Sequence, residues 1–431
     1  MTGDPNILAT ELAASRRRST LVTHDLRGDQ LLGPQLPIVN PPLWELGHLA
    51  WFQEFWCLRH RNGAAPRDSI LPESDTLFDS AKVAHGTRWN LPLPSLQATL
   101  AYQAGVLGLV LRRLEQEPEN AALLYFADLA AFHEDMHAEA FHYTRQTLGY
   151  PDPFEEPTAT DAPPGAREDA ALDGGPLLLG ASKNEGFVFD NEKWAHEVLV
   201  APFRIARTAV TNAEYAAFVD ADGYLRRDLW SKEGWAWRTS AGAAAPRYWS
   251  KEIGAWRLRR FDRVVALPPN HPVMHVNWHE AQAYCRFAHR RLPTEAEWEF
   301  AASMAASGKQ RFPWGNAIPS VNRANLGGGG PAPVDAQPDG DTERGCRQLI
   351  GNVWEWTASA FEPYPGFVVD PYQEYSQPWF GTHKVLRGGS FATSRRLIRN
   401  TWRNFYTPDR GDMFAGFRTC ALKPATPPAA A

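Results

Sequence analysis

The sequence predicts two domains of different class, an N-terminal four-helix bundle and, after a linker, a loop-rich α+β domain. The chain has 431 residues, which is more than one domain usually holds. Apolar residues recur with the period of a helix through the first part, whereas the later part is dense in Gly, Trp and Pro and has short strand-like pieces between loops. We therefore place the bundle at 1–150, the linker at 151–172 and the second domain at 173–425.

Four segments carry the helical period and predict the helices of the bundle. They are TELAASRRRSTLVTHDL (10–26), PLWELGHLAWFQEFWCLRH (42–60), SLQATLAYQAGVLGLVLRRLEQE (95–117) and NAALLYFADLAAFHEDMHAEAFHYTRQTL (120–148). The arginine run in the first segment is predicted to be a helix surface, because no apolar stretch follows it as an export signal would require.

The linker is predicted from PDPFEEPTATDAPPGARED, which has no periodicity and is rich in Pro, Asp and Glu. Beyond it, HEVLVAPFRIA (196–206) and KVLRGGSFA (384–392) have the alternation of strands. Two helices are predicted at TNAEYAAFVDADG (211–223) and WHEAQAYCRFAHRR (278–291). Long loops must therefore make up much of this domain.

The composition argues for small-molecule chemistry. Charged residues make up 22% and the net charge is -5, so no nucleic-acid or membrane-surface partner is expected. No run of about 18 apolar residues is present, which predicts a cytoplasmic chain without a membrane-spanning helix. The four cysteines lie far apart without CxxC spacing and are expected to be reduced, buried thiols. We expect a monomer or a homodimer.

Three histidines outline a metal centre. His133 and His137 stand four residues apart, so a helix would project both imidazoles from one face. His48 lies in a separate amphipathic segment, and a neighbouring helix could bring it to the same ion. Three protein ligands would leave coordination positions open, which is typical of a catalytic metal rather than a structural one.

A different enzyme class is also consistent with these residues. His133, Glu134 and His137 match HExxH, the zinc-hydrolase signature in which the glutamate is the general base. Such enzymes usually have a third ligand downstream, whereas His48 lies upstream. His48 could instead be a core histidine that bonds a backbone carbonyl. A third reading is a non-catalytic binding module.

The second domain carries a series of short motifs in order along the chain, at 177–180, 203–218, 272–302, 313–316, 351–357, 387–391 and 416–418. These motifs resemble those of the formylglycine-generating enzyme, or sulfatase-modifying-factor, domain, and the resemblance implies its C-type-lectin-like fold. Glu295, Glu297, Glu355 and Arg418 are then expected to be paired scaffold charges. Formylglycine generators use a cysteine pair near the C-terminus, but only Cys420 lies in the last 80 residues, which argues against that activity.

The joined architecture, a DinB-like bundle with Hx3H followed by this domain, resembles the ergothioneine-type sulfoxide synthases over the whole chain. The resemblance implies a non-heme iron(II) enzyme that uses oxygen to attach a sulfur nucleophile to C2 of the imidazole of hercynine, the trimethylated histidine betaine. It also implies that His48, His133 and His137 are the iron ligands. Glu134 and Asp135 are then expected to face solvent or to lie behind the ligands.

Two loops of the second domain resemble the substrate loops of that family. In PYPGFVVDPYQEYSQPWF, the resemblance implies that Tyr372 is the proton-donating tyrosine, with Tyr375 as the alternative. In RNTWRNFYTPDRGDMFAGFR, Asn404 would bond the hercynine carboxylate, and either Phe405 or Tyr406 would present a ring face to its trimethylammonium group.

The same loop contains Arg410, which matches the residue that binds the nucleophile's carboxylate in relatives using γ-glutamylcysteine. Those relatives have aspartate where this chain has Tyr406, and commonly glutamine where it has Met136. Losing the acidic partner argues against γ-glutamylcysteine, because the ammonium group of that substrate would be left unpaired.

The segments NPPLWELGHLAWFQEFWCLR (40–59) and FHEDMHAEAFHYTRQTLGY (132–150) resemble the selenoneine synthase branch of the family. Members of that branch join a selenosugar to hercynine by a carbon–selenium bond. The alternative nucleophiles are cysteine and γ-glutamylcysteine, which would make this an ergothioneine-type sulfoxide synthase. Arg88 is expected either to line the nucleophile site or to be a surface arginine.

Overall fold

The computed structural model describes residues 3–61, 64–154 and 165–422, which divide into two compact units. The helical unit comprises Met1–Phe154 together with the short segment Asn184–Phe187. The mixed unit comprises Glu155–Lys183 and Val188–Ala431. The segment Asn184–Phe187 belongs to the helical unit because Phe187 packs its ring against Tyr125 and Phe132.

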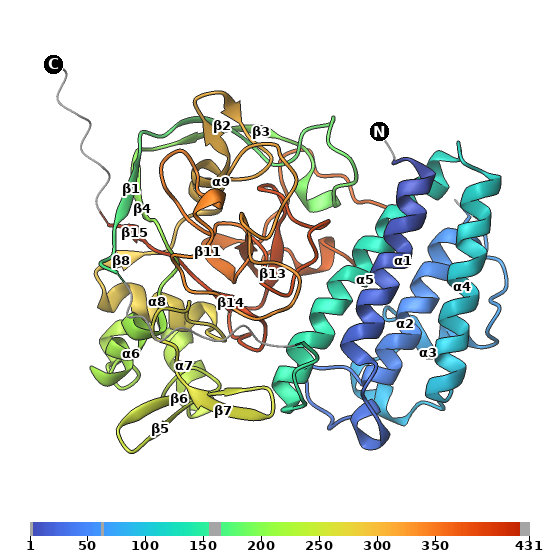
Figure 1. Ribbon diagram of the computed structural model, residues 1–431, viewed down its shortest axis with the longest axis horizontal. Helices are drawn as coiled ribbons and strands as arrows, with labels where there is room; N and C mark the ends of the chain where they lie inside the picture. The colour runs from blue at the N-terminus through green and yellow to red at the C-terminus, as the bar shows by residue number, and fades with distance from the viewer. Residues whose placement is uncertain (1–2, 62–63, 155–164, 423–431) are drawn as a thin grey trace. The chain divides into compact units, whose positions relative to one another are not determined.

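The four predicted helices are confirmed and form the bundle. They are α1 (Pro5–Thr23), α2 (Pro42–Glu54), α4 (Leu96–Gln116) and α5 (Ala121–Leu148). Figure 1 shows them side by side, with α1 against α5 and α2 against α4. The shorter elements of this unit are a π-helical turn that continues α2, η2 (Phe55–Arg59), and η1 (Gly28–Leu31), α3 (Ser74–Phe78) and η3 (His85–Asn90).

Local sequence determines where these helices start and stop. The side chains of Asp4, Ser95 and Asn120 accept hydrogen bonds from backbone N–H groups in the first turns of α1, α4 and α5. The last of these helices ends at Gly149, whose φ of 68° lies in the left-handed region that suits glycine. The long helix α5, which carries two of the three histidines, is therefore capped at both ends.

The mixed unit contains two four-stranded sheets, with strand orders β13-β12-β11-β14 and β1-β4-β15-β8, and three smaller sheets, β2-β3, β5-β6-β7 and β9-β10. Its helices are α6 (Asn212–Asp220), α7 (Lys232–Ala241), α8 (Trp278–Phe287) and α9 (Glu295–Ser303), with short turns η4 (Asp190–Glu192), η5 (Arg227–Leu229), η6 (Pro338–Gly340) and η7 (Gln377–Trp379). The strands are β1 (Asp169–Leu172), β2 (Gly175–Leu179), β3 (His196–Val200), β4 (Phe203–Ala206), β5 (Trp249–Glu252), β6 (Ala255–Arg260), β7 (Arg263–Ala266), β8 (Arg290–Arg291), β9 (Met304–Ala305), β10 (Gly308–Lys309), β11 (Trp354–Ala360), β12 (Lys384–Arg387), β13 (Asn404–Tyr406), β14 (Ala415–Gly416) and β15 (Cys420–Ala421).

The predicted strands and helices of this unit are present, and two details differ from the expectation. The predicted linker 151–172 overlaps β1, which pairs with β4. The acidic, alanine-rich sequence of β1 forms a strand because the alternating residues Ala170 and Leu172 are buried in the core. Part of that linker, 155–164, lies outside the described residues. The helices α7 and α9 were not predicted, although Ser231 and Thr294 cap them with their side chains.

Buried ion pairs hold this unit together, as the motifs predicted. The Arg418 guanidinium donates two hydrogen bonds of 2.7 Å to the Glu355 carboxylate, and Glu295 accepts from Arg387 and Arg403. All four cysteines are buried and free. Within the described ranges no helix is long and apolar enough to cross a membrane.

Candidate metal centre

The structure brings the three predicted histidines together. His48 comes from α2, and His133 and His137 come from one face of α5. One ring nitrogen from each histidine lies within 4.8 Å of the other two. At this separation small side-chain movements would let all three nitrogens coordinate a single ion. The first two are buried, while the side chain of His137 is 20% exposed. The site is therefore most accessible beside His137.

Hydrogen bonds to the far side of two rings determine which nitrogen is left for a metal. The Nδ1 of His48 lies 2.8 Å from the backbone oxygen of Phe78, and the Nδ1 of His137 lies 2.5 Å from Oε1 of Glu45. Both partners accept hydrogen bonds, so each Nδ1 carries the proton and each Nε2 keeps its lone pair. A set of three imidazole donors held in this way fits a divalent transition metal such as iron or zinc.

Burial keeps two of the imidazoles neutral. It lowers the pKa of His48 to about 3, with further lowering by the nearby charges of His137 and Arg88. Burial likewise lowers the pKa of His133 well below its ordinary value, again with the other two histidines adding to the effect. At neutral pH the imidazoles of His48 and His133 are therefore neutral, and each has one unprotonated ring nitrogen available as a ligand.

Aromatic rings hold the ligand imidazoles in place. Trp44, one helical turn before His48, stacks on it with ring centroids 5.1 Å apart and planes within 8°. Phe52, also from α2, stacks on His133 at 3.6 Å and 5°. These contacts fill the space around the rings, so the ligands are packed before any ion binds.

Arg88 lies behind this stack and not on the surface. Its guanidinium sits over the Trp44 ring at 3.9 Å and donates to Asn40 Oδ1 at 2.7 Å and to the backbone oxygen of Val83 at 3.2 Å. The residue is buried, so the surface alternative for Arg88 is wrong. Met136, directly before His137, is half-buried.

The glutamate of the HExxH motif is committed to a structural ion pair. Glu134 is 2% exposed, and its Oε1 accepts hydrogen bonds of 2.6 Å from Arg16 Nε and from Ser19 Oγ. Its Oε2 accepts from Arg16 Nη2 at 3.1 Å. Of the two expectations for Glu134 and Asp135, the solvent-facing one is wrong, since both are buried. Arg16, from the run predicted as helix surface, is also buried.

This arrangement disfavours the zinc-hydrolase reading. A general base must reach a metal-bound water with a free oxygen, whereas the Glu134 carboxylate is occupied by Arg16 and Ser19 of α1. Arg16 also donates to the backbone oxygen of Gln103, which ties three helices of the bundle to this one ion pair. The glutamate therefore stabilises the fold that presents the histidines.

In the mixed unit, the strand β13 separates the predicted substrate residues onto two faces. Asn404 pairs with Leu386, Phe405 with Val385, and Tyr406 with Lys384. Because side chains alternate along a strand, Asn404 and Tyr406 lie on one face and Phe405 on the other. The two aromatic candidates for the trimethylammonium contact are therefore not interchangeable.

The predicted tyrosines lie with Phe405. Its ring stacks on Phe361 at 4.0 Å, and Tyr375 meets it edge-on at 5.7 Å. Tyr372 lies 6.0 Å from Tyr375, ring to ring. Tyr375 is itself stacked on Phe189 at 4.0 Å, and burial raises its pKa well above the ordinary value. Tyr375 is thus the more firmly packed of the two tyrosines.

The opposite face carries cations and aromatic rings. Arg410 lies over the Tyr406 ring at 5.2 Å, and its guanidinium donates to both oxygens of buried Asp412 at 2.5 and 2.8 Å. Lys384, directly across from Tyr406, lies over the Trp278 ring at 4.5 Å. Within the described ranges the Lys384 ammonium has no hydrogen bond or ion pair, and burial lowers its pKa.

Sequence reasoning missed Lys384, Trp44 and Glu45. For Trp44 and Glu45 a signal was available in the sequence. They stand four and three residues before His48, and this spacing places both next to that ligand on a helix. Lys384 has no such signal, since only the pairing of β12 with β13 brings it opposite Tyr406.

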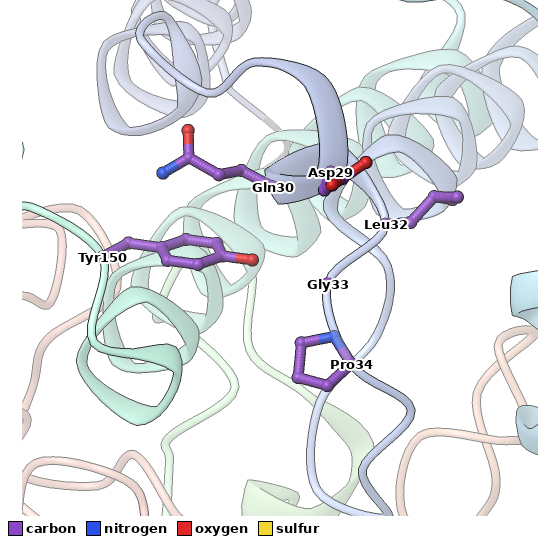
Figure 2. A pocket seen from close by; sticks show the side chains of 6 residues that line it. All are labelled: Asp29, Gln30, Leu32, Gly33, Pro34 and Tyr150. Carbon is purple, nitrogen blue, oxygen red and sulfur yellow. The ribbon is translucent and has the colours of Figure 1, made fainter.

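A separate hollow of about 450 Å³ opens on the helical unit (Figure 2). It contains none of the three histidines. Burial raises the pKa of its Tyr150, to which the charge of Asp29 adds. The hollow is lined by Asp29, Gln30, Leu32, Gly33, Pro34 and Tyr150.

Comparisons with known proteins cover both units. The DinB superfamily model matches residues 11–141, and that of the sulfatase-modifying factor enzyme 1-like domain matches 155–422. A hercynine oxygenase of Mycolicibacterium smegmatis is 38% identical over 95% of this chain and 97% of its own length, and one of Mycolicibacterium thermoresistibile is 39% identical over 95% and 94%. A formylglycine-generating enzyme of Streptomyces coelicolor is 35% identical over 62% of this chain and 92% of its own length.

Proposed function

Because the chain belongs to the hercynine oxygenase family, we propose that it is an ergothioneine-type enzyme that forms a bond between a chalcogen nucleophile and the imidazole of hercynine. It is an oxygen-dependent oxidoreductase that acts on hercynine. The observation that carries this function is the cluster of His48, His133 and His137 within 4.8 Å, in a chain that matches these relatives over nearly its whole length.

The three histidines would hold an iron(II) ion. They supply neutral nitrogen donors and leave further positions for two substrates, an arrangement typical of non-heme iron enzymes that activate oxygen. When bound, iron would activate oxygen and orient the hercynine imidazole beside the nucleophile. The chain's own contribution is to keep His48 and His133 unprotonated and to hold the three rings against Trp44 and Phe52.

For the nucleophile we propose a selenosugar, which would make the product selenoneine. The pairing of Arg410 with Asp412 supports this choice, because a guanidinium that already neutralises a buried carboxylate has little left to offer a substrate carboxylate. Tyr406 stands where γ-glutamylcysteine enzymes have an acid, and its half-exposed ring suits a sugar face better than an ammonium group. Cysteine and γ-glutamylcysteine, which would give a sulfoxide, are the alternatives.

The remaining predicted residues are proposed for these roles. Tyr372 would supply a proton during oxygen reduction, and Asn404 would donate to the hercynine carboxylate. Tyr406, on the same strand face as Asn404, would contact the nucleophile, whereas Phe405 would present its ring to the trimethylammonium group.

Two residues of the helical unit keep proposed roles near the substrates. Met136 would shape the hercynine side of the pocket beside His137. Arg88 would act through Trp44, which its guanidinium covers, and not as a free carboxylate-binding group.

The test is a competition assay followed by mass spectrometry. Iron(II)-loaded protein, hercynine and oxygen are offered a selenosugar, cysteine and γ-glutamylcysteine together. A dominant selenium adduct is expected. A sulfoxide would overturn the selenosugar proposal but keep the family reaction, and no adduct from protein that retains iron would overturn both. His48→Gln should abolish the adduct, whereas His24→Gln, on an exposed histidine outside the cluster, should not.

A further inference from the structure

The ligand His137 has a carboxylate partner that no motif of the sequence marks. Glu45 lies on α2, one turn before the ligand His48, and its Oε1 lies 2.5 Å from the Nδ1 of His137 on α5. The carboxylate is 2% exposed, so it was removed from water to make this contact. One turn of α2 thus supplies a ligand and also the group that orients a ligand from another helix.

A buried carboxylate in this position changes a metal ligand in two ways. It accepts the Nδ1 proton, which turns Nε2 toward the other two histidines and fixes the tautomer. It also draws positive charge onto the ring, which makes the imidazole a stronger donor than a neutral acceptor would. The partner of His48 is such a neutral acceptor, the backbone oxygen of Phe78 at 2.8 Å. The two ligands are therefore expected to bind with different strength.

Charge around the site makes the carboxylate more consequential. Neutral imidazoles bring no charge to a divalent ion, so the Glu45 carboxylate beside His137 would be the nearest source of negative charge among the contacts of the three ligands. A positive group that interacts with it is Arg88, which is buried over Trp44 and hydrogen-bonded to Asn40. Glu45 thus interacts with both a ligand and a cation, and because it is buried, water screens these interactions poorly.

We propose that Glu45 is a positioning residue of the metal centre: it orients His137 and strengthens that ligand relative to His48. That the metal is iron rests on the proposed function, but the role of Glu45 holds for any divalent transition metal in this cluster. The proposal can therefore be tested with cobalt(II) alone, without hercynine or oxygen.

The variant is Glu45→Gln in the full chain. Its amide oxygen can still accept the Nδ1 proton, so the ring can stay in place while the charge is lost. The matched control is Glu54→Gln on the same helix. Glu54 is equally buried, but its carboxylate accepts from Ser69, Tyr102 and the backbone of Ile70, and in the described part of the chain it forms no hydrogen bond with a histidine.

Two quantities are measured on each protein: the Kd for cobalt(II), by competition with a chelator, and the visible absorption spectrum of the bound ion. Glu45→Gln should weaken binding by about 10–100-fold and shift the absorption bands. On the iron-loaded protein it should also raise the reduction potential, because the higher charge of oxidised iron loses its nearby anion. Glu54→Gln should leave the spectrum and the potential unchanged.

Each outcome either supports or overturns the role proposed for Glu45. An unchanged Kd and spectrum in Glu45→Gln would overturn the proposal, and so would an equal spectral change in Glu54→Gln. If Glu45→Gln does not fold, Glu45→Asp replaces it, since it keeps the charge on a side chain one methylene shorter. That variant should hold the potential near the wild-type value while weakening cobalt(II) binding, and a wild-type Kd would overturn the geometric part. A wild-type protein that makes no hercynine adduct, yet shows the cobalt effects, would refute the proposed function and keep this role.

Discussion

Replacing Gly47 by alanine should damage the metal centre through Phe78. Gly47 lies on α2 next to the ligand His48, and an added Cβ would meet Cε1 of the Phe78 ring at 2.2 Å and Cζ at 2.3 Å. Phe78 is buried, and its backbone oxygen accepts the hydrogen bond from His48 Nδ1. Gly47 therefore allows Phe78 to approach α2 closely enough for the Phe78 carbonyl to orient the His48 ring.

The size of the effect follows from these distances. Carbon atoms pack at about 3.5–4.0 Å, so the Phe78 ring would have to retreat by roughly 1.3 Å or more. If the backbone moves with the ring, the contact of 2.8 Å from His48 Nδ1 opens beyond hydrogen-bonding range. Overpacking costs about 1–3 kcal/mol, and the better helix propensity of alanine offsets about 1 kcal/mol of it. We expect a net destabilisation of up to about 2 kcal/mol and a loss of metal affinity on the order of 10-fold.

The assay pairs thermal unfolding of the metal-free protein with a cobalt(II) titration. The control is Gly105→Ala on α4, where the new Cβ would meet only Ile70 at 3.7 Å, an ordinary contact. That control should gain about 1 kcal/mol and bind cobalt(II) as the wild type does. If Gly47→Ala proved as stable as the control and bound the metal equally well, the reasoning about Phe78 would be refuted.

Three further outcomes are expected. Glu134→Gln should lower the free energy of unfolding by about 3–5 kcal/mol, because the buried Arg16 loses its carboxylate partner, and urea unfolding measures this change. The folded variant should keep its cobalt(II) affinity, and a lost affinity would contradict the purely structural role of Glu134. Burial raises the pKa of Glu280 to about 7, above its ordinary 4.5, so the stability that its protonated form contributes is present below pH 4.5 and is lost as the pH rises through 7. Relative to Glu280→Gln, the wild type should therefore lose about 3 kcal/mol between pH 4.5 and 8, and parallel stability curves would exclude this. Tyr372→Phe should lower adduct formation without changing cobalt(II) affinity, whereas Tyr375→Phe should keep most activity; the opposite ranking would transfer the proton-donor role to Tyr375.

Local patterns were sufficient for the four long helices of the bundle and for one pair of ligands, although α7 and α9 were missed. The spacing of His133 and His137 already places both on one face of α5, because a helix turns once in 3.6 residues. The same period predicted α1, α2 and α4, and short strand-like pieces between Gly- and Pro-rich loops predicted the α+β class of the second unit. These features depend on residues near each other in the chain, so the sequence alone determines them.

The partners of those residues were decided by packing between segments far apart in the chain. Only the contact of α2 with α5 brings Glu45 to His137, and only the pairing of β12 with β13 puts Phe405 on the face opposite Tyr406. Likewise, nothing local distinguishes a solvent-facing Glu134 from one paired with Arg16, which lies 118 residues away in the chain. The sequence determined which groups could bind a metal. The tertiary structure decided which way they point and which carboxylate contacts a ligand, because orientation depends on neighbours that no local period specifies.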